Sequence, residues 1–331
     1  MPKESPQDED PFLEEDEDYI PVVRACHIKQ RSGVNRVKCM PQSGAMVASW
    51  GEDGSVSVHN VAALLRSLDD DKSEHETRTV DWKPVAGFAG HQAEGFALAW
   101  SAVTEGLLLS GDQQGAIHLW EPELVQGRKN WAVDTVPFRG HNGSVEDLVW
   151  SPSEARVFAS CSTDRTVMLW DARGKKAPVM TIAGHQDEVN VLSWNAHVTH
   201  LLATGADDGV WKVHDLRKAN SAEADVFTFG FHKQPITSID WCPFEDSMIA
   251  VASADDSVTI WDLSATHDDE QQPLPDAAAD PFLATVPEQL LFLHRGVTDP
   301  KEVHWHKQIP GMVVVTAANG FHLFAPENVM G

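Results

Sequence analysis

The most regular pattern of hydrophobic and polar positions in this 331-residue chain lies between Gly140 and Asp171. Apolar residues recur in three short runs, mostly at every second position and separated by polar turn residues, over residues 145–150, 157–161 and 167–170. A period of two predicts β-strands. With a fourth strand expected at residues 179–182, the stretch predicts a four-stranded sheet, which must bury its faces against similar sheets.

The same pattern repeats along the chain. In four units a Trp ends the first expected strand nine residues after an opening His: His91 and Trp100, His141 and Trp150, His185 and Trp194, His232 and Trp241. Several units also begin with Gly-His and end with Trp-Asp. Units of about 40 to 45 residues with these ends resemble the WD repeats of β-propellers, in which each repeat forms one blade. The fold class expected is therefore an all-β WD-repeat propeller.

Four polar positions recur at fixed spacing within these units. In WD-type blades a His, a strand hydroxyl, a turn Asp and a Trp form a buried hydrogen-bonded tetrad, and each polar group left unpaired would cost about 1 to 3 kcal/mol. The complete set is His141, Ser160, Asp164 and Trp170. Because the residues recur in every unit, they are interpreted as structural and not as a catalytic Ser-His-Asp triad.

The other units deviate from this set. The next unit has His185, Thr204 and Asp208 but His214 in place of Trp, and the following one has His232, Asp255 and Trp261 but Val251 in place of the hydroxyl. The unit that opens at His91 has Ser110 and Trp120, with Gln114 at the turn position. These differences predict incomplete tetrads.

Two further units are expected at the ends of the repeat region. A degraded one opens at His27 with Ser49 and Asp53 at tetrad positions, and the last opens at His294 and carries Trp305 on its first strand. The expected domains are an acidic disordered tail at residues 1–18 and a propeller at 19–331. Insertions are expected near 62–80, beginning with a short helix, and near 265–289. Six units are recognisable, so the ring either closes with six blades or continues in sequence upstream of Met1.

Composition narrows the possible partners. The chain has 25 basic and 50 acidic residues and a formal net charge of −25, which argues against general nucleic-acid binding and favours cationic partners. The four cysteines show no paired spacing and are expected to be reduced core thiols of a cytosolic or nuclear protein: Cys26, Cys39, Cys161 and Cys242. No signal peptide, membrane span or phosphate-binding loop is apparent, so no membrane association, cofactor or enzymatic activity is expected.

Several segments resemble a particular family more closely than a generic WD repeat. They are FAGHQAEGFALAWS from Phe88, GHNGSVEDLVWSP from Gly140, FASCSTD from Phe158, HQDEVNVLSW from His185, QLLFLHRG from Gln289 and KEVHWH from Lys301. With the acidic tract that precedes them, they resemble the glutamate-rich WD-repeat proteins from about residue 19 onward. The family's longer N-terminal region has no counterpart in this sequence.

The resemblance implies a function. It suggests a nuclear and nucleolar factor of large-subunit ribosome assembly, acting as a chaperone for a basic ribosomal protein or within a pre-ribosomal particle. Histone binding, reported for the family, is one alternative. The other is a substrate receptor of a cullin-type ubiquitin ligase. It rests on the Trp-Asp-x-Arg segment that ends at Arg173 and its relative that ends at Arg217, and this motif is common in WD repeats.

Acidic residues give the candidate binding sites. Loop and turn positions expected on one face of the propeller carry Glu52, Glu94, Asp112, Asp187, Glu188, Asp207 and Asp256. The tail adds Asp8, Glu9, Asp10, Glu14, Glu15, Asp16, Glu17 and Asp18. Convergence on one face predicts a surface for an Arg- and Lys-rich protein, although ordinary solvated loops would look similar. His304 and His306 could share a strand face as metal ligands, but no third ligand supports a zinc site.

Overall fold

The computed structural model describes residues 24–70, 78–219, 221, 223–265 and 286–329. The tail at 1–18 and most of the expected insertion at 265–289 lie outside these residues. The chain divides into two compact units. Of the described residues, the smaller contains 24–29, 62–70 and 78–82, and the larger contains 30–61 and those from Lys83 onward.

The smaller unit contains the helix expected at the start of the first insertion. It consists of β1 (Cys26–Ile28), α1 (Ala62–Asp70) and β5 (Arg78–Val80), with β1 and β5 paired in parallel. His27 lies on β1 and pairs in register with Thr79, so it does not open a blade, contrary to the sequence-based expectation. No helix in the described residues is long and apolar enough to cross a membrane.

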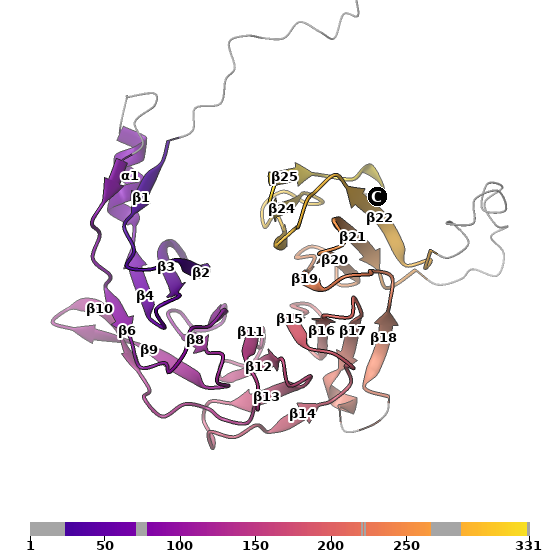
Figure 1. Cartoon of the computed structure of the whole chain (residues 1–331), viewed down its shortest axis with the longest axis horizontal. Helices are drawn as coiled ribbons and strands as arrows, with labels where there is room; N and C mark the ends of the chain where they lie inside the picture. Colours follow the sequence, from indigo (N-terminus) through magenta and orange to yellow (C-terminus); the bar gives the residue numbers. More distant parts are fainter. Residues whose placement is uncertain (1–23, 71–77, 220, 222, 266–285, 330–331) are drawn as a thin grey trace, which may run out of the picture. The chain divides into compact units, whose positions relative to one another are not determined.

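The larger unit is built from six antiparallel sheets, as Figure 1 shows. The first sheet contains β2 (Val34–Met40), β3 (Ser43–Gly51), β4 (Val56–Asn60) and β6 (Ala86–Phe88). The second contains β7 (Ala97–Trp100), β8 (Leu108–Gly111), β9 (Ile117–Val125) and β10 (Arg128–Val133). The third contains β11 (Val145–Trp150), β12 (Val157–Ser162), β13 (Val167–Asp171) and β14 (Met180–Ile182).

The remaining sheets follow the same order. The fourth contains β15 (Val189–Trp194), β16 (Leu201–Ala206), β17 (Trp211–Asp215) and β18 (Asp225–Phe229), with a 3₁₀ turn at Leu216–Lys218. The fifth contains β19 (Ile236–Trp241), β20 (Met248–Ser253), β21 (Ser257–Asp262) and β22 (Leu290–Arg295). The sixth has three strands, β23 (Glu302–Trp305), β24 (Val313–Ala317) and β25 (Gly320–Phe324), followed by a 3₁₀ turn at Glu327–Val329.

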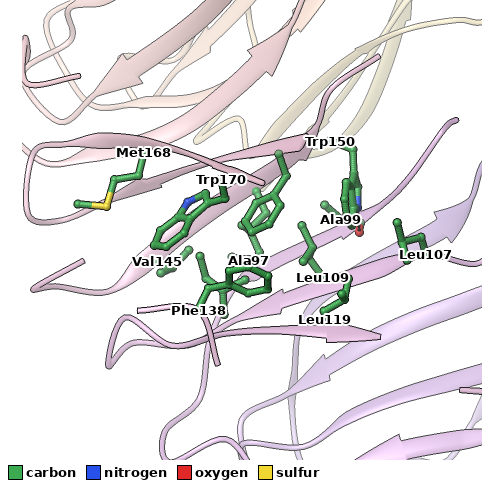
Figure 2. Packing of buried hydrophobic residues seen from close by; sticks show 13 residues of the cluster. Ala97, Ala99, Leu107, Leu109, Leu119, Phe138, Val145, Trp150, Met168 and Trp170 are labelled. Carbon is green, nitrogen blue, oxygen red and sulfur yellow. Dashed lines mark hydrogen bonds between the residues drawn. The ribbon is translucent and has the colours of Figure 1, made fainter. Parts of the chain in front are cut away.

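Each sheet buries its apolar face against the next one. Figure 2 shows the cluster between the second and third sheets, in which Phe138 and Phe158 pack against Trp170. Four further clusters of buried residues join the other consecutive sheets. Buried apolar area stabilises such packing by about 25 cal/mol per Å², so each sheet depends on its neighbours.

The first strand of each sheet lies beside the first strand of the next, from β2 through β7, β11, β15 and β19 to β23. In four sheets the Trp at the end of the first strand connects it to the preceding first strand, whereas Trp194 donates to Thr199 within its own sheet. The indole of Trp150 donates to the Ala99 carbonyl at 3.0 Å, and Trp305 donates to the Asp240 carbonyl at 3.0 Å. Trp100 and Trp241 make equivalent bonds. The larger unit is therefore a six-bladed β-propeller, as the repeats predict.

The cysteines differ in environment. Cys161 and Cys242 are buried, and burial raises the pKa of both thiols. Cys26 is half-buried and Cys39 is exposed on β2. All four are free thiols, but the expectation of core positions is wrong for Cys39.

Candidate protein-binding face

The tetrad of the third sheet fixes the loop that enters β11 and the turn that follows β12. His141 Nδ1 lies 2.9 Å from Asp164 Oδ2, and His141 Nε2 lies 2.7 Å from the hydroxyl of Ser160. The Trp170 indole donates to the same hydroxyl at 2.8 Å. Burial would raise the pKa of Asp164, but its hydrogen bonds, first the one from His141, outweigh burial and hold the pKa well below the usual range.

The second sheet also has a complete tetrad, with a different acid from the expected one. His91 Nδ1 contacts Asp112 Oδ2 at 2.9 Å, and Ser110 contacts both His91 Nε2 (2.8 Å) and the Trp120 indole (3.0 Å). Asp112 is fully buried. Gln114 is therefore not the acceptor, and Asp112 is a structural residue and not part of an exposed acidic surface.

The fourth sheet replaces the expected acceptor. The Thr204 hydroxyl lies 2.7 Å from His185 Nε2 and 2.8 Å from His214 Nε2, and His214 Nδ1 continues to Asp225 Oδ1 at 2.8 Å. Asp208 instead accepts from the Val210 amide, and no described residue partners the buried Nδ1 of His185. The assignment of Asp208 to a tetrad is thus wrong. Burial lowers the pKa of His185 to about 3, so this ring is neutral.

In the fifth sheet, a hydroxyl on the third strand takes the place of the one that is missing from the second strand. His232 Nδ1 contacts Asp255 at 2.9 Å, and its Nε2 contacts the Thr259 hydroxyl at 2.9 Å. Thr259 also accepts from the Trp261 indole at 2.8 Å. Val251 therefore does not break the chain, contrary to expectation, because Thr259 on β21 lies opposite it in register.

The first and last sheets have no such tetrad among the described residues. Both ring nitrogens of His59 are buried without a partner, and the Nε2 of His294, which was expected to open the last unit but lies on β22 of the fifth sheet, is likewise unpaired. Asp53 accepts from Ser55.

A repeated backbone bond places loops and turns on one face. In every sheet, the turn between the second and third strands donates an amide to the loop that enters the first strand. The bonds run from Glu52 to Gly33 (3.0 Å), Gln113 to Glu94 (3.0 Å), Thr163 to Ser144 (3.1 Å), Asp207 to Glu188 (2.9 Å), Ala254 to Pro235 (2.9 Å) and Ala318 to Thr298 (2.8 Å). We call the face of the propeller that carries these loops and turns the entry face, because the first strand of each sheet begins there.

Six of the seven expected rim acids lie on the entry face. Glu52, Glu188 and Asp256 are exposed, and Glu94, Asp187 and Asp207 are partly buried. None of the six pairs with a cationic side chain among the described residues. Their partners are neutral: Glu94 accepts from the Asn35 amide at 2.9 Å, and Asp207 from the Asn190 amide at 2.6 Å. Their negative charge is therefore uncompensated.

The entry face is not uniformly acidic. The third sheet presents Asn142 and Ser144 in its loop and Arg165 in its turn, and the fifth adds Lys233. The uncompensated acids come from the first, second, fourth and fifth sheets.

Several acidic residues at the opposite end of the sheets are ion-paired, although Asp262 at the end of β21 accepts, within the described part of the chain, only from Ser247 and Ser264. Arg173 contacts Asp171 through Nε (2.9 Å) and Nη2 (2.8 Å), and Arg217 contacts Asp215 in the same forked way. These pairs follow the third strands, which end away from the entry face. Glu105 with Lys129 (2.6 Å) and Glu121 with Arg156 (2.6 Å) lie at the same end. Arg173 and Arg217, the candidate adaptor contacts, are thus about two-thirds exposed while paired.

A cavity opens at the centre of the entry face. Its volume is about 690 Å³, and residues at or just before the start of each first strand line it, including Asn35, Phe96, Glu146, Asn190, Thr237, Lys301 and Glu302. Four of these are the extra residues of β-bulges in β2, β11, β15 and β19. Bulges commonly re-aim a side chain at functional sites. The sequence reasoning missed this set, although Phe96, Glu146, Asn190 and Thr237 each lie five residues after the opening His.

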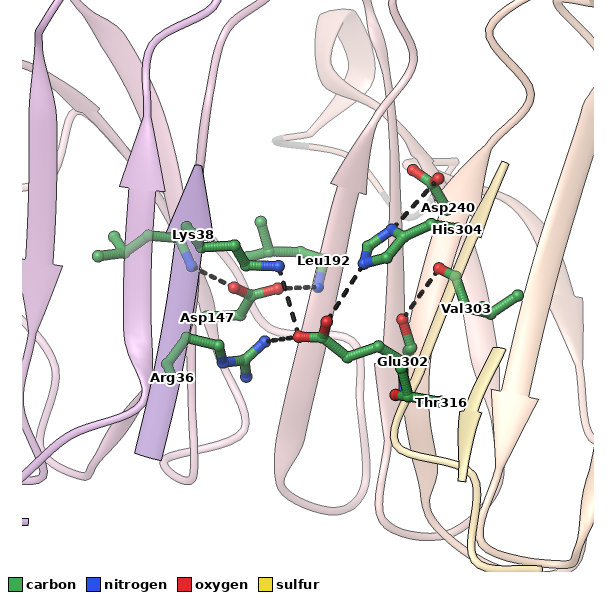
Figure 3. Close-up of polar contacts among 11 residues, drawn as sticks. Arg36, Lys38, Asp147, Leu192, Asp240, Glu302, Val303, His304 and Thr316 are labelled. Carbon is green, nitrogen blue, oxygen red and sulfur yellow. Dashed lines mark hydrogen bonds and ion pairs between the residues drawn. The ribbon is translucent and has the colours of Figure 1, made fainter. Parts of the chain in front are cut away.

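A charged network lies along the inner strands between this cavity and a second one of about 510 Å³. Figure 3 shows Glu302 on β23 facing Arg36 and Lys38 on β2, with N–O distances of 2.9 and 3.5 Å. His304 lies between Glu302 and Asp240 at 3.4 Å from each. Burial would lower the pKa of His304, but these two carboxylates outweigh it and raise the pKa to about 9. His304 is therefore cationic near neutral pH.

His306 does not join His304 in a shared site. Its Nδ1 accepts from the amides of Gln308 (3.1 Å) and Ile309 (3.0 Å). The two rings are thus engaged with different neighbours.

Comparison with known proteins places these features in a family. The sequence model described as "WD domain, G-beta repeat" matches residues 133–171, 176–215 and 224–262. Protein HEAT STRESS TOLERANT DWD 1 of Arabidopsis thaliana is 42% identical over 315 residues, covering 93% of this chain and 66% of the relative. Ribosome assembly protein rrb1 of Schizosaccharomyces pombe is 40% identical over 314 residues (92% and 63%). Glutamate-rich WD repeat-containing protein 1 of Dictyostelium discoideum is 41% identical over 310 residues (93% and 62%). The chain spans about two thirds or less of each relative's length.

Proposed function

Because this chain is a WD40-repeat protein and a homologue of ribosome assembly protein rrb1 and glutamate-rich WD repeat-containing protein 1, we propose that it is a non-enzymatic binding scaffold in ribosome biogenesis. Its client is a basic protein of the large subunit, held on the entry face as by a chaperone. The corresponding location is the nucleus, and the nucleolus within it.

The segregation of charge carries this proposal. Six carboxylates on the entry face, among them Glu94 and Asp207, pair with no Arg or Lys in the described residues, whereas Glu105, Glu121, Asp171 and Asp215 at the opposite end each pair with Arg or Lys. If the entry acids were merely solubilising, the two ends would not need to differ. Uncompensated charge on one face attracts and orients a cationic partner.

The acidic tail extends the same chemistry. Residues 1–18 carry nine acidic residues and one lysine and lie outside the described residues. Each exposed charge pair contributes about 0.2 to 1 kcal/mol, so affinity would come from the number of pairs and from linkage of tail and face. Such binding weakens with salt, because the screening length falls from about 10 Å at 0.1 M to about 3 Å at 1 M.

The test uses two variants that each remove four charges. The entry variant is Glu52→Gln, Asp187→Asn, Glu188→Gln and Asp256→Asn. The matched control is Glu105→Gln, Glu121→Gln, Asp171→Asn and Glu223→Gln, at the opposite end. Proteins stripped from purified large ribosomal subunits would be captured on the protein, identified by mass spectrometry and then titrated at low and high salt.

We expect the entry variant to lose client affinity and salt dependence, and the control to keep both. A further arm neutralises the tail from Asp8 to Asp18. Equal losses in the entry variant and the control would reduce the effect to net charge and refute the proposal. Preferential capture of core histones over ribosomal proteins would identify the client as histone instead.

A further inference from the structure

The cavity at the centre of the entry face has a single carboxylate without a cation. Arg36 Nη1 is held by Glu302 at 2.9 Å, and Lys301 Nζ is held by Asp299 at 2.7 Å. Glu146 pairs with no cationic side chain among the described residues. The cavity thus contains two compensated cations and one uncompensated anion.

The position of Glu146 makes this charge costly in the free protein. It is the bulge residue of β11 and is half-buried. Burial raises the pKa of its carboxyl, and the nearby charges of Glu188 and Asp147 add to this. The Ser144 hydroxyl and the charge of Arg36 lower the pKa without cancelling the effect of burial. A buried charge is stabilised when a hydrogen-bonded counter-ion joins it. Glu146 is therefore placed to gain from a cation that enters from solvent.

The walls around Glu146 favour a flat cation. Phe96 supplies an aromatic ring, and Pro235 and Ile236 supply apolar surface. The amide nitrogens of Asn35 and Asn190 are used by Glu94 and Asp207, which leaves their carbonyl oxygens as acceptors. These two bonds also attach the cavity to the rim acids.

We propose that this cavity binds one arginine side chain of a basic client, with the guanidinium paired to Glu146. This inference rests on the proposed function and identifies the cavity that would give client binding its specificity. A guanidinium offers five donors in a planar fork and stacks on aromatic and apolar surfaces, whereas a lysine ammonium is a compact and strongly hydrated charge. The volume of about 690 Å³ lies within the range of about 300 to 1,000 Å³ usual for ligand pockets.

The test measures discrimination between peptides. The probe is a fluorescein-labelled peptide, Gly-Ser-Lys-Gly-Arg-Gly-Lys-Ser-Gly, and its partners carry Lys or citrulline in place of the Arg. Fluorescence anisotropy would give the affinity of each for the full chain. We expect the Arg peptide to bind about tenfold more tightly than the Lys peptide of equal charge, which corresponds to about 1.4 kcal/mol, and the citrulline peptide to bind more weakly than both.

Two variants locate the effect. Glu146→Gln should abolish the preference for Arg over Lys, whereas Glu188→Gln should weaken both peptides by one common factor and leave the preference intact. Unfolding curves check that both variants fold. Equal affinity of the parent for Arg and Lys peptides, or an unchanged preference in Glu146→Gln, would overturn the arginine site while leaving charge-driven binding to the face in place. Failure of every peptide to bind would count against both proposals.

Discussion

The tetrads allow a test in which sequence and structure disagree. Asp164 and Asp208 each lie 23 residues after an opening His and four after a hydroxyl, so the repeat pattern treats them as equivalent. In the structure Asp164 accepts four hydrogen bonds: from the His141 ring (2.9 Å), the Asn142 amide (2.9 Å) and the amide and hydroxyl of Thr166 (3.0 and 2.6 Å). Asp208 accepts one, from an exposed turn amide.

The expected costs follow from these contacts. Asp164→Ala leaves the buried His141 Nδ1 with only the Thr166 hydroxyl, 3.3 Å away, and removes the amide bonds, so it should lower the free energy of unfolding by about 2 to 4 kcal/mol. Asp208→Ala removes one solvated bond and should cost no more than about 1 kcal/mol. Asp112→Ala, at a spacing that the pattern does not recognise, should behave like Asp164→Ala because Asp112 is buried against His91.

Denaturant unfolding with a common m-value gives these differences directly. Far-ultraviolet circular dichroism of the three variants before denaturation checks that the sheets form. Similar losses for Asp164→Ala and Asp208→Ala would mean that the tetrad follows the repeat spacing, and the hydrogen-bond assignment in the fourth sheet would be wrong.

Three other expectations can be checked in the same way. Thr259→Val should destabilise the fifth sheet by about 1 to 3 kcal/mol, and adding Val251→Ser should restore part of the loss by returning a hydroxyl to its usual strand. The pKa of His304 is about 9 in the folded protein and about 6.5 in the unfolded chain, so the stability that His304 contributes is present below pH 6.5 and is lost as the pH rises through about 9. Because 48% of its side chain is exposed, this loss should be only about 1 kcal/mol. His304→Gln should therefore flatten the pH profile of the free energy of unfolding. If a cullin-type adaptor is captured, Arg173→Ala with Arg217→Ala should abolish capture without moving the unfolding midpoint, and absence of any such adaptor from the unmutated protein would end the ligase alternative.

The propeller architecture can be predicted from the sequence because the same sheet pattern repeats along the chain. Alternating apolar runs and the His-to-Trp spacing predict the sheets, and every first-strand Trp except Trp194 joins neighbouring sheets through a bond such as that from Trp150 to Ala99. Such contacts depend on local spacing, which a linear pattern preserves. By contrast, His27 fits the repeat spacing poorly, since Asp53 follows it by more than 23 residues, and the structure places His27 on β1 in the smaller unit.

The partners of the tetrads were harder to predict because they depend on strand register. Asp225 on β18 contacts His214 on β17 next to a shift in strand register, and no feature of the sequence predicts this shift. Thr259 could have been found, since it lies two residues before Trp261 and so shares its side of the strand. Three of the four bulge residues also carry a signal, a fixed position five residues after His141, His185 and His232, but only the structure shows that they line a cavity.

The repeated antiparallel sheet explains how one face can hold unpaired acids. Each first strand begins on the entry face and each third strand ends on the opposite one, so the same sequence positions always reach the same face. Acids placed just after the opening His, such as Glu94 and Glu188, therefore gather at one end, while an acid that precedes an Arg by two, such as Asp171, is neutralised at the other. Rim and tail would then supply long-range attraction that any basic chain can satisfy, whereas Glu146 at the centre can accept only what enters the cavity. Strength and selectivity would reside in different residues, which is why salt should weaken all basic ligands alike and leave the preference for arginine unchanged.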